Sequence, residues 1–187
     1  MNDLHLQFLA SPDWAKMLET DLLPWILQAG DLGDDVLEIG PGPGLTTDIL
    51  RERVAHVTAV ELDDDLAAKL AERLKNTNVD VVHADATKSG LPSDRFSTAA
   101  SFSMLHHMPE QRMHDELFAE VFRMLRPGGR FFVADAVDHE LLREFHVDDI
   151  FVPVDTDTLD ERLEAAGFAK PEIELTEYEV RFSATKP

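Results

Sequence analysis

Short apolar runs alternate with amphipathic segments along most of the chain. Runs rich in Val, Ile and Ala are typical of buried strands, whereas apolar positions three and four apart are typical of helices. The runs predict strands at residues 35–39, 56–60, 79–83, 96–102, 130–134, 172–176 and 179–184. The amphipathic segments predict helices at residues 45–54, 63–74, 110–125 and 158–167. This alternation predicts an α/β fold with a doubly wound, mostly parallel sheet and helices on both faces.

Several helix ends carry local signals. Ser11 followed by Pro12 is a favoured helix start, because serine caps the N-terminus and proline fits the first helical position. Thr158 and Glu161 have the spacing of a capping box, in which each side chain bonds the other's backbone N–H. Gly167 is a typical helix stop. We therefore expect helices beginning near residues 12 and 159.

The segment before the first strand has its own apolar stripe. Leu18, Leu22 and Trp25 recur at helical spacing in this segment. We see no linker or repeat after it, so it predicts a helical cap rather than a separate globular unit. The expected organisation is an N-terminal helical cap at residues 1–33 and one domain at residues 34–187.

Composition narrows the classes of function. The chain has 187 residues, 44% hydrophobic and 29% charged, which is ordinary for one globular domain. It contains no cysteine, which excludes a thiolate nucleophile and thiolate-bound metals. With 17 basic and 37 acidic residues the net charge is −20, which opposes binding to nucleic acid. The absence of a signal-peptide pattern and of about 18 consecutive apolar residues predicts a cytoplasmic protein without membrane contact.

A glycine-rich turn follows the first predicted strand. Gly40, Gly42 and Gly44 have the spacing G-x-G-x-G, whereas a dinucleotide fingerprint would need a third glycine at position 45, which is leucine. This spacing argues against a nicotinamide dehydrogenase. Glu61 ends the second strand about 20 residues later, where a carboxylate accepts the two hydroxyls of a ribose. Together these residues predict an adenosine-type ligand at the carboxyl ends of the strands.

Five motifs occur in the order and spacing of one known family, at residues 36–44, 57–63, 83–86, 101–108 and 125–131. They resemble the successive motifs of class I S-adenosylmethionine-dependent methyltransferases, and the resemblance extends over residues 34–187. It implies a seven-stranded Rossmann-like sheet with an antiparallel last strand. It also implies S-adenosylmethionine as cofactor and S-adenosylhomocysteine as product.

The resemblance implies roles for nine residues around the cofactor. The methionine portion would lie among Glu38, Gly40, Gly42, Gly44 and Ser101. Glu61 would bind the ribose, with Leu62 against the adenine. Asp85 would accept a hydrogen bond from the adenine amino group, and Ala86 would offer a backbone contact. The methyl group would then face the segment that follows the fourth strand.

His106 and His107 follow that strand, and either is a candidate general base. The alternative is structural, because the segment resembles a Leu-His-His stretch that family members with unrelated substrates share. Acidic and histidine residues also gather after the fifth strand, at Asp135, Asp138, His139, His146, Asp148 and Asp149. They could hold a divalent metal as in catechol-type methyltransferases. Their spacing is not distinctive, and the last 50 residues hold 14 acids in any case, so we expect no metal site.

Two alternatives stand beside methyl transfer to a small molecule. The first is an RNA or DNA methyltransferase, because residues 36–85 also resemble ribosomal RNA adenine dimethylases. Those enzymes carry an Asn-Pro-Pro-Tyr-like motif after the fourth strand, whereas this chain has Ser101-Phe102-Ser103-Met104. The second is a non-catalytic S-adenosylmethionine-binding module. The sequence favours a small-molecule acceptor and leaves its identity, and the oligomeric state, open.

Overall fold

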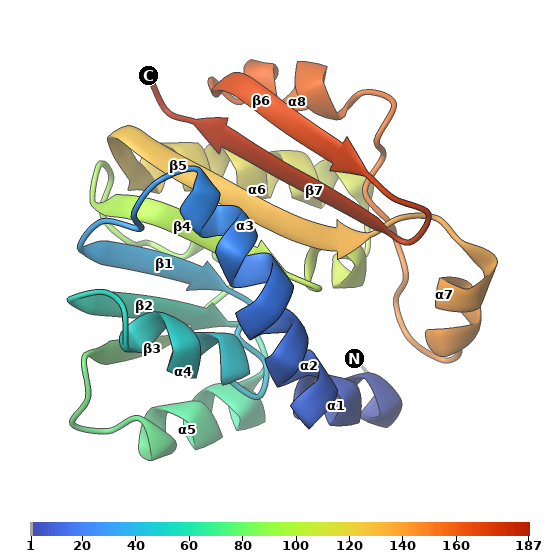
Figure 1. The fold of residues 1–187 in the computed structure, drawn as a ribbon, viewed down its shortest axis with the longest axis horizontal. Helices are drawn as coiled ribbons and strands as arrows, with labels where there is room; N and C mark the ends of the chain where they lie inside the picture. Colours follow the sequence, from blue (N-terminus) through green and yellow to red (C-terminus); the bar gives the residue numbers. More distant parts are fainter. Residues whose placement is uncertain (1) are drawn as a thin grey trace.

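The computed structural model describes residues 2–187 and contains one seven-stranded sheet (Figure 1). The strands lie in the order β3-β2-β1-β4-β5-β7-β6. Their bounds are β1 Asp35–Ile39, β2 His56–Glu61, β3 Val79–His83, β4 Phe96–Phe102, β5 Leu125–Ala136, β6 Ala169–Leu175 and β7 Glu179–Thr185. The pairs among β1 to β5 are parallel, and β7 is antiparallel to both β5 and β6. The predicted doubly wound, mostly parallel sheet is confirmed.

Helices cover both faces of this sheet. The α-helices are α1 Asp3–Leu9, α2 Pro12–Met17, α3 Leu23–Gln28, α4 Leu45–Arg51, α5 Asp64–Arg73, α6 Gln111–Met124, α7 Glu140–Phe145 and α8 Leu159–Ala165. A π-helical turn, η1 Leu18–Leu22, joins α2 to α3, and the short 3₁₀ turns are η2 Ala86–Lys88 and η3 Leu105–His107. In Figure 1, α3 and α4 cover the near face while α6 lies behind the sheet. Within residues 2–187 no helix is long and apolar enough to cross a membrane.

The core lies in two layers, one on each side of the sheet. On one side α6 and α8 bury Leu117 and Leu163 against Phe131 of β5. On the other, the N-terminal helices bury Leu22 and Ile26 in the same cluster as Phe132. Burial of each side chain of this size stabilises the folded state by about 1.5–3 kcal/mol. Neighbouring residues of β5 thus point to opposite layers, as the period of a strand requires.

Some predicted element boundaries are correct and others are wrong. Ser11 caps α2 as predicted, accepting a hydrogen bond from the backbone N–H of Trp14 at 3.2 Å. The predicted capping box at the start of α8 does not form. The Thr158 hydroxyl instead donates to Asp155 Oδ2 at 2.9 Å, so it makes no cap hydrogen bond. The competing carboxylate three residues upstream explains this error.

The fifth strand is longer than the pattern predicted. It starts at Leu125 rather than residue 130, because Leu125 pairs with Phe96 and the glycines that follow bond to the end of the chain. Gly128 N–H donates to the carbonyl of Lys186 at 2.8 Å. The pattern also did not predict α1 or α7, which have seven and six residues. Helices of two turns are too short to show a clear apolar period.

Candidate active site

A pocket of about 560 Å³ opens at the carboxyl ends of β1 to β4. This is the edge at which open α/β sheets bind ligands. Its walls come from the glycine turn, the ends of β2 and β3, the start of α5 and the segment after β4. The lining residues singled out by sequence are Gly40, Glu61, Leu62, Asp85, Ala86 and His107. The structure therefore brings six of the eleven predicted site residues to one cavity.

The three glycines of the turn share a backbone conformation, and two of them also have no room for a side chain. All three have positive φ, 69° at Gly40, 53° at Gly42 and 87° at Gly44. A Cβ on Gly40 would lie 2.3 Å from Met104 Cγ, so a larger residue would displace the segment after β4. A Cβ on Gly44 would lie 2.4 Å from Leu70 Cδ1, where α4 packs on α5. Gly40 lies in the pocket wall, whereas the contacts of Gly44 are packing contacts between helices.

Glu61 holds the turn from the end of β2. Its Oε2 accepts the backbone N–H of Gly42 at 3.0 Å, and its Oε1 accepts that of Asp63 at 3.0 Å. The side chain is largely buried, yet it reaches the pocket wall. A carboxylate offers about four acceptor sites, so each oxygen keeps one for a ligand hydroxyl. This is the chemistry that ribose recognition requires.

Glu38 lies behind the turn. It is buried, and its Oε2 accepts the Thr47 hydroxyl at 2.6 Å. Burial raises the pKa of Glu38 to about 8, and the nearby carboxylate of Glu61 adds to the rise. Glu38 lines a small cavity on the far side of Gly40 rather than the large pocket. At neutral pH this side chain is therefore mainly uncharged.

The remaining predicted cofactor residues divide into lining and buried positions. Asp85 lies in the pocket wall, where its Oδ1 accepts the Thr87 N–H and hydroxyl at 3.0 and 2.8 Å. Partial burial alone would raise the pKa of Asp85, but bonds from Thr87 and Lys88 outweigh it, so the pKa is lowered. Leu62 is exposed at the pocket, as an adenine-facing side chain would be. Ser101 is fully buried and donates to the Ile39 carbonyl at 3.3 Å.

The two histidines after β4 differ in position. His107 lines the pocket, whereas His106 is buried and its Nδ1 lies 2.6 Å from Asp135 Oδ1. Asp135 also accepts the N–H groups of Met104 and Leu105 at 2.9 and 2.7 Å. Burial would raise the pKa of Asp135, but His106 and these bonds lower it to about 2. His106 is therefore held as part of the framework, and His107 is the histidine that can reach a ligand.

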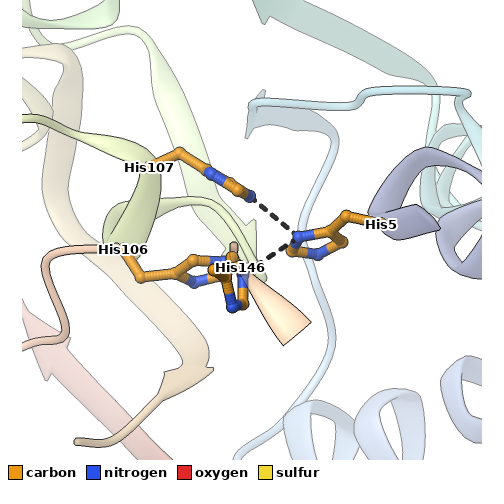
Figure 2. A group of neighbouring side chains, drawn as sticks. All are labelled: His5, His106, His107 and His146. Carbon is orange, nitrogen blue, oxygen red and sulfur yellow. Dashed lines mark hydrogen bonds between the residues drawn. The ribbon is translucent and has the colours of Figure 1, made fainter. Parts of the chain in front are cut away.

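One histidine near the pocket was not singled out by the sequence. Within residues 2–187, the group of side chains close enough to share a metal ion is His5, His106, His107 and His146 (Figure 2). His5 lies in α1, far from the others along the chain, and no spacing signal connects them. Of the predicted Asp and His cluster after β5, only His146 belongs to this group.

Comparison with known proteins identifies the family. A family model described as "Methyltransferase domain" matches residues 37–133, just over half of the chain. The chain belongs to this methyltransferase domain family. The matched segment runs from β1 into β5 and so includes the glycine turn, Glu61, Asp85 and both histidines after β4.

Individual relatives are more distant. A probable ribosomal RNA small subunit methyltransferase A of Methanothermobacter thermautotrophicus is 36% identical over 142 residues, covering 68% of this chain and 51% of that protein. The chain spans about half, or less, of the length of the curated relatives that it matches. The PH0226 protein of Pyrococcus horikoshii has the same fold, with a TM-score of 0.78 at 20% identity, over 100% of this chain and 94% of that one. Phosphoethanolamine N-methyltransferase 2 of Haemonchus contortus, solved with S-adenosyl-L-methionine, gives 0.73 at 17% identity over 88% of this chain and 52% of its own.

Proposed function

We propose that this chain binds S-adenosylmethionine in the pocket and transfers its methyl group to a small-molecule acceptor. The observation that carries the proposal is Glu61, a carboxylate anchored by two backbone N–H groups with acceptor capacity left in the pocket wall. Family membership supports it, because the matched residues include those that form this wall. The Haemonchus protein, whose structure contains S-adenosyl-L-methionine, has the same fold and supports the choice of ligand.

The charges around the pocket suit a cation. Its lining contains the acidic side chains Glu61, Asp63, Asp65 and Asp85 and one basic side chain, Lys69. When bound, S-adenosylmethionine supplies an electrophilic methyl group on a positively charged sulfonium. The acidic side chains of the pocket wall attract this cation and interact more weakly with the neutral thioether product. The acidic side chains and the ribose contacts together are expected to set the affinities for the cofactor and for its product.

The chain's own contribution to the chemistry is mainly positioning. Holding a nucleophile and a methyl group at reacting distance lowers the activation free energy by about 7–11 kcal/mol. His107 is the residue in the pocket wall that can accept a proton from an acceptor. Burial and the neighbouring His106 lower the pKa of His107 to about 4, so its ring is neutral at pH 7 but accepts a proton less readily than an ordinary imidazole.

The acceptor side of the pocket favours a small apolar molecule. Met104, Met108, Met113, Leu6 and Ile150 line it, and thioether side chains adapt to ligands of varied shape. They contribute no positive charge that would bind a phosphate backbone. An RNA acceptor is the second candidate, favoured by the ribosomal RNA methyltransferase among the relatives.

The segment after β4 argues against that second candidate. Flipped bases are held by hydrogen bonds and by stacking on aromatic rings. The corresponding stretch here begins with the buried Ser101 and ends with Met104, whose side chain lies against Gly40. This stretch therefore offers neither the amide nor the ring at the expected place for a base.

Calorimetry with four ligands tests the proposal. S-adenosylmethionine and S-adenosylhomocysteine are expected to bind, and NAD and ATP at least tenfold more weakly. A panel of small amines, phenols and carboxylates, together with ribosomal RNA fragments, is then assayed for transfer of a radiolabelled methyl group. Transfer to a small molecule supports the proposal, and transfer to RNA alone would replace it with the second candidate. Cofactor binding without transfer to any acceptor would favour a binding module.

A further inference from the structure

Four histidine rings from three distant segments meet beside the pocket. His5 comes from α1, His106 and His107 from η3, and His146 from the end of α7. One ring nitrogen of each lies within 4.8 Å of the other three. Figure 2 shows the four side chains gathered together, with contacts from His107 and His146 converging on His5.

Two of the rings have their outward nitrogens fixed by acceptors. His106 Nδ1 lies 2.6 Å from Asp135 Oδ1, and His146 Nδ1 lies 2.6 Å from the Leu142 carbonyl. A carboxylate and a carbonyl only accept, so both Nδ1 atoms must carry the proton. In a neutral ring the inward Nε2 is then a bare lone pair. His146 Nε2 lies 3.1 Å from His5 Nδ1, and one nitrogen of His106 lies within 4.8 Å of those of the other three rings.

The outward nitrogens of the other two rings also have an oxygen nearby, although the one beside His107 lies beyond hydrogen-bond distance. His5 Nε2 lies 3.3 Å from Ser103 Oγ, and His107 Nδ1 faces Asp149 Oδ1 at 3.7 Å. A neutral imidazole carries one proton, so His5 has it on either Nδ1 or Nε2. Each ring of the group has an oxygen beside its outward nitrogen.

The protons available cannot satisfy the inward nitrogens. His5 Nδ1 lies 3.1 Å from His107 Nε2 and 3.1 Å from His146 Nε2, yet it has at most one proton to donate. His106 Nε2 is buried and has no hydrogen-bond partner among residues 2–187. An unpaired buried acceptor destabilises the folded state. A cation at the centre would replace this repulsion between lone pairs with four bonds.

We infer that His5, His106, His107 and His146 form a binding site for one divalent transition-metal ion of the zinc type. Neutral imidazoles are preferred ligands of zinc, with nitrogen to metal distances of about 2.0–2.1 Å. Oxygen acceptors on the outward nitrogens are the usual outer shell of such sites, because they fix each ring's orientation. Asp135 and Asp149 supply negative charge near the ion.

Four protein ligands leave no coordination position for a substrate, so the site is structural rather than catalytic, and His107 cannot act as a general base while it holds the ion. Its effect would be to hold α1 and α7 against η3, three segments that share no strand pairing. Leu6 of α1, His107 of η3 and Ile150, which follows α7 in the chain, line the pocket. An ion at the site would therefore fix the acceptor side of the pocket. The sequence led us to expect no metal, because the acidic and histidine residues after the fifth strand have no distinctive spacing, and it did not single out His5.

Metal titration of the untagged chain tests the site without any cofactor. The protein is stripped with chelator, and Co²⁺ is added while the visible spectrum is recorded. One equivalent is expected to bind and to give the strong absorption of a tetrahedral ion, which one equivalent of Zn²⁺ then removes. Elemental analysis should find about one zinc per chain after reloading. Absence of binding at micromolar metal, or an octahedral spectrum, would overturn the inference.

Variants locate the ion. His5→Gln and His107→Gln should each lower the affinity for Co²⁺ at least tenfold, whereas His83→Gln, at an exposed histidine outside the group, should leave it unchanged. Equal binding in all three variants would place the ion elsewhere and contradict the inference. Circular dichroism confirms folding, and the wild-type spectrum remains decisive if a variant unfolds. S-adenosylhomocysteine affinity is measured on the same samples, so failure of the metal site and failure of the proposed function are distinguishable.

Discussion

Glu61→Gln replaces one carboxylate oxygen with an NH₂ group, which donates hydrogen bonds and cannot accept them. The native side chain accepts N–H groups from Gly42 and Asp63 at 3.0 Å each, which leaves one acceptor site on each oxygen for the ribose. In the variant one ribose hydroxyl loses its acceptor and the other faces a neutral oxygen. The substitution keeps the volume of the side chain, so packing around it is retained.

The expected loss follows from the strength of hydrogen bonds to a charged group. Each contributes about 1.5–3 kcal/mol, and every 1.4 kcal/mol is about tenfold in affinity. We therefore expect S-adenosylhomocysteine to bind about 10- to 100-fold more weakly to Glu61→Gln. Loss of one backbone anchor of the glycine turn should also lower the free energy of unfolding by about 1 kcal/mol.

Isothermal titration calorimetry measures the affinity, and urea unfolding measures stability separately. Glu72→Gln is the matched control, because it removes the same charge from an exposed residue of α5 whose Oε2 lies 3.9 Å from Lys75. The control should bind like wild type. A folded Glu61→Gln protein whose affinity stays within twofold of the control would refute the assignment of Glu61 to the ribose.

Three further results are expected. Glu38 has a pKa raised from 4.5 to about 8, so the folded state holds an extra proton and loses stability as the pH rises between these values. The free energy of unfolding of Glu38→Gln, measured with urea at pH 5 and pH 8, should not show this loss. A loss as large as that of the wild type would contradict the burial argument. Gly44→Ala should cost more stability than Gly90→Ala, because both have positive φ but only Gly44 has no room for a Cβ. Equal losses in thermal unfolding would show that the backbone alone matters. Filter binding at low salt should find no micromolar affinity for ribosomal RNA fragments, because the net charge is −20 and screening is weakest there; tight binding would favour the RNA acceptor.

The long, regular elements were predictable because their signals are local. The strand at residues 35–39 has the predicted bounds, and α6 differs from the prediction by one residue at each end. Its apolar stripe has 14 residues in which to show a helical period. By contrast, α1 has only two turns. At the start of α8, the Thr158 hydroxyl bonds Asp155 instead of capping the helix. Which of two nearby partners a hydroxyl bonds depends on local geometry, and the residue types alone do not determine that geometry.

The candidate site divides in the same way. Glu61 was predictable, because a carboxylate at the end of the second strand follows from the order of the elements. The histidine group was not, because His5 and His146 are 141 positions apart and meet only when α1 and α7 fold against the same edge of the sheet. Likewise, the contact of Gly44 with Leu70 depends on how α4 and α5 pack. Site residues at the ends of predicted strands can therefore be predicted from the sequence. Residues that meet only through the packing of distant helices and loops can be found only in the structure.

A crystal structure of the chain grown with S-adenosylhomocysteine tests the central claim most directly. The account predicts the ligand in the pocket, with both ribose hydroxyls at hydrogen-bond distance, about 2.7 Å, from the Glu61 carboxylate. It further predicts the adenine between Leu62 and Asp85 and the sulfur near Gly40. Ligand bound at another place, or a pocket that stays empty at saturating ligand, would contradict it.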